Sequence, residues 1–412
     1  MHPLKPLLTV HGALLASSIW CQYQGTGSVS QGLATTVEAN IYTCPNGRIP
    51  AIGSIVASDN TTWTVPAVVD LEDASFPFAS VLYNPCTGVT YNTSDQALAA
   101  LPGTDIVTID PDGEVITGYI FADNYFELWV NGVPVGKDDV PYTQFNSNIV
   151  RFRVQRPFTL AMLLVDWEEH LGIGTEANGG FSDHAGDGGM VAVFTNSLGQ
   201  IIATTGSDWK AQVFYTAPIM DLSCPQEVGA QRLSSDCSTQ DSNDGSGYHA
   251  LHWPRPADWT SATFNDADWP LASTYTNAQV GVNNKPAYTN FTNVFDDAQH
   301  DASFIWSTNL ILDNEVLVRH TVDEDASVAD RHTIQQPFRL QPAGGEGLFA
   351  LQLSGELRPE EITDIRIRDL SGRVVKQQRS YANTIDLMAC EPGLYVLCID
   401  YRGQVGTITF IR

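Results

Sequence analysis

The sequence predicts an all-β protein, and three features of its 412 residues lead to this expectation. Charged residues make up only 17% of the chain, below the roughly 25% of an average soluble protein, which argues against long solvated helices. Short apolar runs such as Ile52–Val56, Trp63–Val69 and Phe78–Tyr83 alternate with Gly, Pro, Asn and Asp, as strands alternate with turns. Other stretches have the two-residue period of a strand. We therefore expect β-sandwich architecture.

The N-terminus has the pattern of a signal peptide, to which we assign residues 1–22. Lys5 supplies the positive start, and the apolar stretch Pro6–Ala16 is followed by Ser17 and Ser18. No later segment reaches the roughly 18 apolar residues of a membrane span. We expect an exported protein, either at the cell surface or outside the cell.

Seven cysteines fit an oxidising compartment. Two pairs bracket turn-rich or polar stretches, and we predict the disulfides Cys44–Cys86 and Cys224–Cys237. Cys398 shares a strand face with Leu394 and Val396, where a cysteine is often a small buried hydrophobe. The states of Cys390 and Cys398 both stay open.

Residues 23–110 read as an N-terminal β-rich region, which is either part of the main sandwich or a small domain of its own. One helix is expected at Ser94–Leu101, with Ser94 as its N-cap. The stretch Asp110–Gly113 then makes a turn by composition.

The longest strand pattern is Val115–Val130. Along Tyr125–Val130 the side chains alternate, so that Phe126, Leu128 and Val130 share one face, and Tyr125, Glu127 and Trp129 share the other. The dipeptide Asn131-Gly132 follows, and it favours a two-residue hairpin turn because both positions adopt positive φ. Two strands and a tight turn are expected here.

The stretch Ala122–Gly132 resembles a hairpin of galactose-binding-like β-sandwich domains, the jelly-roll modules of many secreted glycosidases and lectins. Further segments match that family in order: the strands Ile149–Val154 and Phe158–Asp166, which we expect to pair, then Gly188–Phe194 with Ile201–Thr204, Gly206–Lys210, Trp259, Phe264–Trp269 and Phe304–Ser307. The resemblance implies a jelly-roll sandwich over residues 111–325, with ligand-binding loops at one end of its strands.

Residues 326–347 read as a linker, because Pro337–Gly347 is rich in Pro and Gly and lacks periodicity. Strand patterns follow at Ile362–Leu370, Arg373–Val375, Ile385–Leu387, Leu394–Leu397 and Gly406–Arg412. The tail resembles the C-terminal sorting domain of type IX secretion cargo through Asp369, Gly372, Arg373, Val375, Gly393, Tyr395, Leu397 and Gly406. The last strand lacks the lysine usual in that family. The resemblance implies that residues 348–412 form a small β-sandwich whose partner is the type IX secretion machinery.

The formal net charge is −26, and the chain has five lysines. Nucleic-acid binding needs a clustered basic surface, so we exclude it. The acidity is explained by the solubility of exported proteins, with cationic partners or carboxylate-held divalent metal as alternatives.

The densest polar stretches are Asp166–Gly172 and Ser182–Gly189. Paired carboxylates there could act as general acid and base on a glycoside, or they could simply line loops between strands. The chain has no Gly-x-Ser-x-Gly elbow, no Cys/His pattern beyond the predicted disulfides and no phosphate-binding loop. We therefore predict no catalytic residues.

The expected ligand site lies where loops 167–189 and 224–252 converge near the rim that begins Tyr125–Val130. The candidate residues are Asp123, Asn124, Trp167, Glu168, His170, His184 and Asp187. Trp129, Trp167 and Tyr125 are expected on an exposed face that suits sugar stacking, whereas Trp209, Trp269 and Trp306 are expected in the core.

The sequence identifies no certain cofactor, and a structural calcium ion is the best supported by residue type. Its candidate ligands are Asp236, Asp241, Asn243 and Asp244, and a second candidate set is Asp110, Asp112 and Glu114. The first set lacks the bidentate Glu of an EF-hand. His170, His184, His249 and His252 lack the spacing of known zinc motifs, so we expect structural roles for them.

The sequence therefore predicts a secreted, non-catalytic protein that binds an extracellular glycan or polysaccharide. The alternatives are a polysaccharide-acting hydrolase that uses the carboxylates of residues 166–187, and a surface adhesin without a small-molecule ligand.

Overall fold

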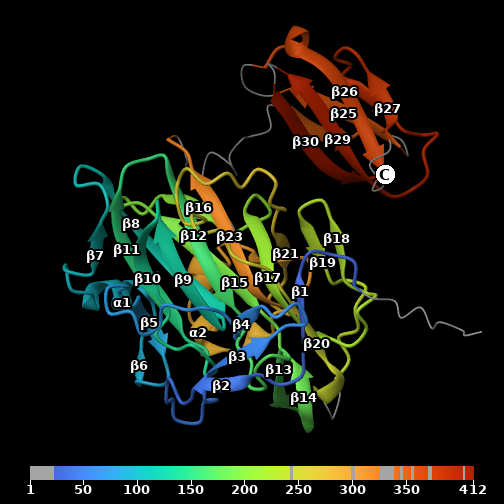
Figure 1. The fold of residues 1–412 in the computed structure, drawn as a ribbon. Coiled ribbons are helices and arrows are strands. Elements are labelled where there is room, and N and C mark those ends of the chain that lie inside the picture. The colour runs from blue at the N-terminus through green and yellow to red at the C-terminus, as the bar shows by residue number, and fades with distance from the viewer. Residues whose placement is uncertain are drawn as a thin grey trace, which may run out of the picture. The chain divides into compact units, whose positions relative to one another are not determined.

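The computed structural model describes residues 23–241, 245–297, 302–324, 338–343, 347–353, 357–369, 374–401 and 404–412, and these are almost all strands and turns (Figure 1). The predicted all-β class is confirmed. The chain divides into a large unit that ends at Glu324 and a small unit made mainly of residues 325–412. The predicted signal peptide lies outside the described residues. Among the described helices, none has both the length and the apolar character that a membrane crossing requires.

The large unit is built on two sheets. The first has seven strands, in the spatial order β1 (Ser28–Gln31), β20 (His249–His252), β17 (Lys210–Ile219), β23 (Asp313–Val322), β12 (Phe158–Val165), β9 (Tyr125–Val130) and β10 (Val133–Lys137). The second has the order β21 (Ser273–Tyr275), β22 (Phe304–Trp306), β15 (Gly189–Thr195), β8 (Glu114–Asp123), β11 (Ser147–Val154), β5 (Ser80–Asn84) and β6 (Val89–Thr90), with β16 (Ile201–Thr204) paired to β15 and β7 (Ile106–Thr108) paired to β11.

The predicted strands 149–154 and 158–166 exist as β11 and β12, but they do not pair with each other. β11 pairs with β5, β7 and β8 in the nine-stranded sheet, whereas β12 pairs with β9 and β23 in the seven-stranded sheet. The turn between them therefore crosses from one layer to the other. Phe152 of β11 and Phe158 of β12 meet across the interior, with ring centroids 5.7 Å apart.

The strand pattern Val115–Val130 also passes between layers. β8 ends at Asp123 in the nine-stranded sheet, and β9 begins at Tyr125 in the seven-stranded sheet, so Asn124 forms the corner. The expected hairpin turn follows β9: Asn131 and Gly132 have φ values of 51° and 83°, and β10 returns antiparallel to β9. Glycine and asparagine adopt positive φ more readily than other residues, so this turn forms with little strain.

The N-terminal β-rich region belongs to the main sandwich. β1 joins the seven-stranded sheet and β5, β6 and β7 join the nine-stranded one. A separate three-stranded sheet, β2 (Thr35–Glu38), β3 (Ile52–Val56) and β4 (Thr62–Val65), packs Ile55 and Val65 against Tyr215 and Ala217 of β17. This small sheet therefore covers part of the outer face of the seven-stranded sheet.

The expected helix forms as α1 (Ser94–Ala100), but Thr93 is its N-cap in place of Ser94, because the Thr93 hydroxyl accepts a hydrogen bond from the Gln96 backbone. The remaining short elements are α2 (Pro286–Thr289), α3 (Thr292–Phe295), the 3₁₀ turns η1 (Gly245–Gly247) and η2 (Val282–Asn284), and the two-stranded pairs β13 (Thr175–Asn178) with β14 (Phe181–Ala185) and β18 (Gln226–Val228) with β19 (Gln231–Leu233).

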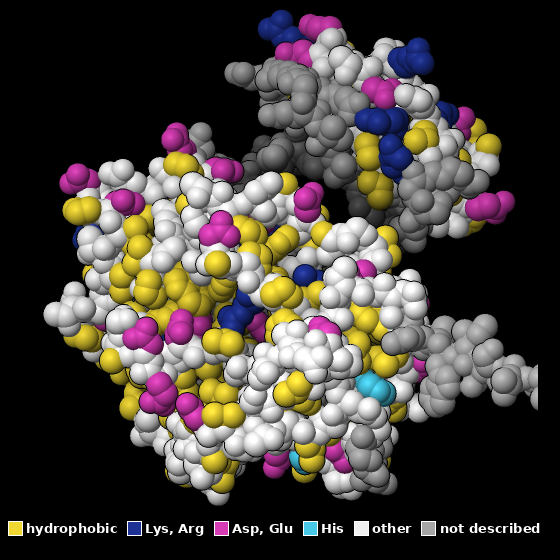
Figure 2. Space-filling model, viewed as in Figure 1, with side chains coloured by type: hydrophobic (Ala, Val, Ile, Leu, Met, Phe, Trp, Pro, Cys, Tyr) yellow, Lys and Arg dark blue, Asp and Glu magenta, His cyan; other side chains and the backbone are white. Residues whose placement is uncertain are grey.

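The predicted core tryptophans are confirmed, since Trp209, Trp269 and Trp306 are all buried. The surface carries the acid excess: Figure 2 shows one face of the large unit, where acidic side chains are scattered among apolar areas and basic side chains are sparse.

The small unit has two sheets of its own. β24 (Phe338–Pro342), β25 (Leu348–Leu353) and β28 (Thr384–Asp386) form one, and β27 (Val374–Gln378), β26 (Ile362–Asp369), β29 (Leu394–Tyr401) and β30 (Gln404–Ile411) form the other, with the turn η3 (Pro359–Glu361) before β26. β24 lies inside the stretch that we assigned to the linker and pairs with β25, so the folded unit begins earlier than residue 348. Gly372 and Arg373, two of the residues that carry the sorting-domain resemblance, lie outside the described residues.

The state of Cys398, which the sequence left open, is that of a partly exposed side chain. On β29 the buried side chains are Tyr395, Leu397 and Ile399, so Cys398 falls on the opposite, less buried face. Cys390 and Cys398 are both free thiols.

The two predicted disulfides are confirmed, at sequence separations of 42 residues for Cys44–Cys86 and 13 residues for Cys224–Cys237. A crosslink removes chain entropy from the unfolded state, and the effect grows with loop length. Replacing both cysteines of a pair by alanine should lower the free energy of unfolding by about 4 kcal/mol for the first pair and about 3 kcal/mol for the second. Urea unfolding of each double variant measures this loss, and peptide mapping that finds a cross-pairing between the two sets would contradict the assignment.

Candidate functional site

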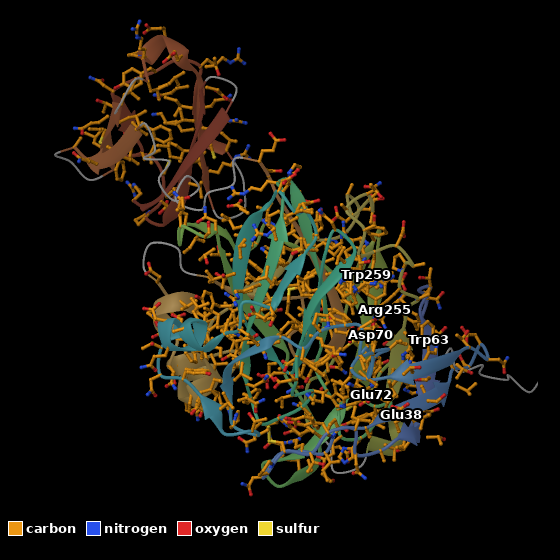
Figure 3. The ribbon with its side chains drawn as sticks, turned by 90° about the vertical axis from the view of Figure 1, so that its left-hand side faces the viewer. Glu38, Trp63, Asp70, Glu72, Arg255 and Trp259 are labelled. Carbon is orange, nitrogen blue, oxygen red and sulfur yellow. A yellow bond between two sulfur atoms is a disulfide. The ribbon has the colours of Figure 1, made fainter. Side chains whose placement is uncertain are left out.

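Two neighbouring hollows lie on the outer side of the seven-stranded sheet. We call them the Trp hollow, of about 400 Å³, and the Val hollow, of about 440 Å³; both contain Thr64 and Val68 in their linings. Figure 3 shows Trp259, Arg255, Asp70 and Trp63 of the first and Glu72 and Glu38 of the second following one another along one side of the large unit. Each volume is within the roughly 300–1,000 Å³ of small-molecule sites.

The sheet alone does not make these hollows, because much of its outer face is covered. Tyr125, Ala161 and Leu163 on the strands pack against side chains of segments 67–71 and 253–269 in one apolar cluster. The hollows are the space that these covering segments leave open. Their position therefore depends on contacts between residues far apart in the sequence.

The Trp hollow is lined by four tryptophans, Trp63, Trp129, Trp253 and Trp259. The indole rings of Trp129 and Trp259 meet edge to face with centroids 5.0 Å apart. The Trp63 ring stacks on His252, with an interplanar angle of 12°, and His252 stacks in turn on Tyr215. The rings are thus held in place by packing, which presents rigid aromatic surface to a ligand.

Four charged residues complete the lining: Asp70, Glu127, Arg255 and Glu315. Nε of Arg255 lies 2.9 Å from Oε1 of Glu315, so these two charges neutralise each other. Burial raises the pKa of Glu315. The remaining carboxylates, Asp70 and Glu127, have no such cation in the lining.

Glu127 projects from β9 into the base of the Trp hollow. Its Oε1 accepts hydrogen bonds from the Asp70 backbone N–H and, at 2.8 Å, from the Tyr125 hydroxyl. Burial raises the pKa of Glu127 to about 7, although these two hydrogen bonds act against the rise. Within the described part of the chain, no group donates a hydrogen bond to its Oε2.

The loop that carries Asp70 is held by a buried lysine. Nζ of Lys137, on β10, donates to the backbone carbonyls of Asp70, Leu71 and Asp73 at 2.7, 2.8 and 2.8 Å. Together with the Asp70–Glu127 hydrogen bond, these contacts fix one wall of the Trp hollow. The sequence pattern around Lys137 did not indicate that it holds this loop.

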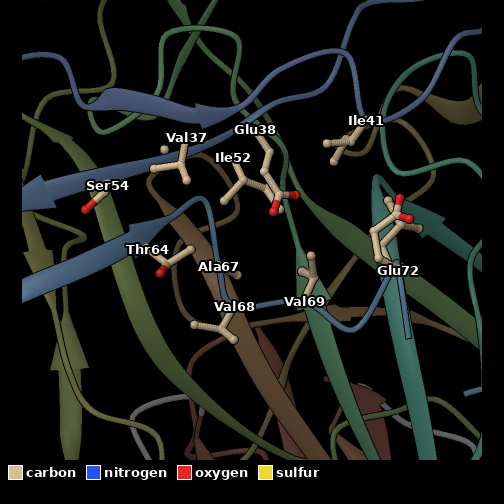
Figure 4. A pocket seen from close by; sticks show the side chains of 12 residues that line it. Val37, Glu38, Ile41, Ile52, Ser54, Thr64, Ala67, Val68, Val69 and Glu72 are labelled. Carbon is tan, nitrogen blue, oxygen red and sulfur yellow. The ribbon is translucent and has the colours of Figure 1, made fainter. Parts of the chain in front are cut away.

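The Val hollow is more apolar. Figure 4 shows the side chains of Val37, Ile52 and Val68 around it, with the carboxylates of Glu38 and Glu72 at its edge. Val37 and Val68 are more than half exposed, at 64% and 58%. This exposed apolar surface can contact the C–H faces of a ligand that extends beyond the Trp hollow.

Four of the predicted contact residues, Asp123, Asn124, Trp167 and Glu168, are buried. Oδ1 of Asn124 accepts a hydrogen bond of 2.6 Å from the Trp167 backbone, and the Trp167 ring packs edge to face on Tyr125. Glu168 accepts hydrogen bonds from the Gly174 backbone and the Tyr215 hydroxyl. These contacts brace the loop, and they leave Trp167 and Glu168 no surface for direct ligand contact.

The expectation that Tyr125 and Trp167 form an exposed stacking face is also wrong, because both are buried beneath the covering segments. Trp129 is the member of that set that reaches a hollow.

The two loops converge as expected, since Nδ1 of His184 lies 2.5 Å from Oδ1 of Asp241. His170 and Asp187, like His184, are half-buried. His170 contacts Thr175 through Nδ1, at 3.0 Å. Neither His170, His184 nor Asp187 lines the Trp or Val hollow.

Acidic side chains gather near this corner of the sandwich. Burial raises the pKa of Asp123 and Asp166 well above the usual range, and the charges of Asp187 and Glu176 raise it further. Burial also raises the pKa of Asp187 to about 6. Arg48 pairs with Glu176 and compensates part of this charge.

Neither calcium candidate forms a metal site among the described residues, where no group of three or more His, Cys, Asp or Glu side chains is arranged around a common point. Asp241 contacts His184, Asp236 is exposed, and Asn243 and Asp244 lie outside the described residues. In the second set, Asp110 accepts from the Gln155 backbone and Glu114 pairs with Arg156.

No protein-family model matches the chain, and no curated protein matches it. Among solved structures, a β-D-glucuronidase of Dictyoglomus thermophilum is 10% identical at a TM-score of 0.16, with 95% of this chain and 44% of that chain covered. The BSP domain of a biofilm-associated protein is 8% identical at a TM-score of 0.16, with 99% and 84% covered. The chain spans less than half the length of the glucuronidase. Scores this low support no inference about fold or function.

Buried carboxyls give an expected pH dependence of stability. The pKa is raised to about 7 for Glu127 and Glu168 and to about 6 for Asp187 and Asp313, so above pH 5 the folded state binds more protons than the unfolded chain. Their contribution is therefore present at low pH and is lost as pH rises through 6 to 7. His252, whose pKa is lowered to about 3, acts in the opposite direction but is a single group. We expect a higher Tm at pH 5 than at pH 8.

The variant Glu168→Gln tests whether buried carboxyl groups cause this pH dependence of stability. The amide oxygen can still accept both hydrogen bonds, but it does not titrate, so the pH dependence should shrink by on the order of 3 kcal/mol in the free energy of unfolding. Glu169→Gln, at the neighbouring and more exposed carboxylate, is the matched control. This variant should keep the pH dependence of stability that the parent shows. Stability that increases steadily from pH 5 to pH 8 in the parent would contradict the account.

Proposed function

We propose that this protein is an exported, non-catalytic carbohydrate-binding protein that holds an extracellular glycan in the Trp hollow, with the Val hollow as its extension. The observation that carries the proposal is the combination of four tryptophans with hydrogen-bonding charged groups around one open space. Sugar rings present apolar C–H faces that pack on indole rings, and hydroxyls that bond to carboxylates and guanidinium groups.

Two further observations support this assignment. The Trp and Val hollows share part of their linings, which suits an extended oligosaccharide better than a single small molecule. The resemblance of Ala122–Gly132 to galactose-binding-like domains points to the same ligand class, although fold likeness does not identify a ligand. The predicted loop residues act in this proposal by bracing the sandwich, with contact to the ligand coming from Trp129 and its neighbours.

Export is the second part of the proposal. The two disulfides favour an oxidising compartment. The likeness of the C-terminal residues to type IX sorting domains supports delivery to the cell surface or the medium by that machinery.

A hydrolase that acts on polysaccharides is the second candidate function, because the raised pKa of Glu127, about 7, is suited to a general acid. Release of reducing ends from the same oligosaccharides distinguishes the two. Hydrolysis that is lost in Glu127→Gln would establish the enzyme, and binding without hydrolysis establishes the module.

Trp129→Ala should remove most of the binding, because this half-buried ring offers its surface to the Trp hollow. Loss of one stacked aromatic is expected to cost roughly tenfold or more in affinity. A glycan array identifies the bound sugars, and calorimetry on the best of them measures the loss. Phe181→Ala, at an exposed aromatic on β14 that lines neither hollow, is the control. Equal loss in both variants, or none in Trp129→Ala, would remove the Trp hollow from the proposal.

A chain that ends at Glu324 should fold but stay in the periplasm, because the large unit has its own core and lacks the proposed sorting domain. Fractionation of the host, with a non-reducing gel to check the disulfides, measures the outcome. If the shortened chain still reached the medium, the sorting role of the C-terminal unit would be wrong.

A further inference from the structure

The Trp hollow has an excess of negative charge that its own cations do not balance. Of its three carboxylates, Glu315 is paired with Arg255 at 2.9 Å. Asp70 is exposed at the rim, and Glu127 lies at the base. The hollow therefore offers two carboxylates and no unpaired cation among its lining residues.

Glu127 is the more informative of the two. Its side chain is almost completely buried, with 1% exposure, yet it lines the Trp hollow. Oε1 is occupied by the Asp70 backbone and the Tyr125 hydroxyl, and no described residue donates to Oε2. Oε2 is not among the fully buried polar atoms that lack a partner, so it keeps contact with the open space of the hollow, where an ammonium donor of a ligand can reach it.

Lys137 does not supply a donor to Oε2 of Glu127. Nζ of Lys137 donates to three backbone carbonyls and is not part of the lining of the Trp hollow. Its ammonium attracts the charges of Glu127 and Asp70, but it is held by the three carbonyls and does not donate to Oε2. The tryptophan faces also favour a cation, because the ring quadrupole presents negative charge above the plane.

We propose that the Trp hollow is specific for an amino sugar, with the protonated amine of a deacetylated glycan donating to Oε2 of Glu127. This inference rests on the proposed function and names the chemical class of its ligand. Uronic acids are disfavoured by the same carboxylates, and N-acetylated sugars replace the charged donor by a neutral amide.

A lysine side chain also presents an ammonium group, but the lining fits a sugar better. The exposed Asp70 and the half-buried Arg255 offer an acceptor and donors in the lining, which sugar hydroxyls can use and a lysine stem cannot. The edge-to-face indoles of Trp129 and Trp259 provide a broad apolar wall that suits a ring.

The test is calorimetry of the full chain with three hexamers: fully deacetylated glucosamine, N-acetylglucosamine and glucose. The parent should bind the glucosamine hexamer at least about tenfold more tightly than the other two, as expected for one charge-assisted hydrogen bond. Glu127→Gln keeps an oxygen for the Asp70 and Tyr125 donors but loses the charge. The preference should therefore fall to about one, while binding of the glucose hexamer persists. Asp95→Asn, at an exposed carboxylate of α1, is the control and should keep the preference.

Each outcome has a distinct meaning. Binding of all three hexamers with equal affinity overturns the amine specificity and leaves the glycan-binding proposal standing, whereas no binding of any glycan overturns both. An oligolysine peptide that competes as well as the glucosamine hexamer would assign the hollow to lysine side chains and overturn the sugar. If Glu127→Gln loses its near-UV circular dichroism, the parent's own ranking of the three hexamers still decides the proposal, because equal affinities overturn it in a protein whose fold is intact.

Discussion

The wall of the Trp hollow depends on one buried ammonium group. Lys137 donates hydrogen bonds to three backbone carbonyls of one loop, those of Asp70, Leu71 and Asp73. Glu127, on the neighbouring strand, accepts a hydrogen bond from the Asp70 backbone N–H. Backbone carbonyls that would otherwise need water are satisfied by a charge inside the protein. Without Lys137, segment 67–76 would lose its polar attachment to β10 and would keep the hydrogen bond from the Asp70 backbone to Glu127 of β9.

The strands were predictable because their signals are local. Alternation along Tyr125–Val130 and the Asn131-Gly132 turn depend on neighbours in sequence, and both were found where expected. The pairing of the strands was harder to predict from the sequence. β11 and β12 follow each other in the chain, but burial on both faces places β12 in the centre of the other sheet, and only the complete fold reveals that.

Most of the candidate site could not be predicted from the sequence, because it also depends on contacts between distant segments. Alternation correctly placed Tyr125, Glu127 and Trp129 on one strand face, but it contains no information about what covers that face. Segments from both ends of the large unit bury Tyr125 and Trp167 and leave Trp129 partly open. The polar loop residues attracted attention by composition, yet Asn124 and Glu168 use their polar atoms to hold the backbone.

The position of β23 determines how the large unit bears a load applied at its C-terminal side. β23 is the last strand of the large unit, and it pairs with β12 on one side and β17 on the other along most of its length. A pulling force along this strand loads both hydrogen-bond ladders in shear, so many bonds must break together before the strand leaves the sheet. Because β12 and β9 connect β23 to β10, the strand that carries Lys137, such a load is shared across the sheet and does not act on β23 alone.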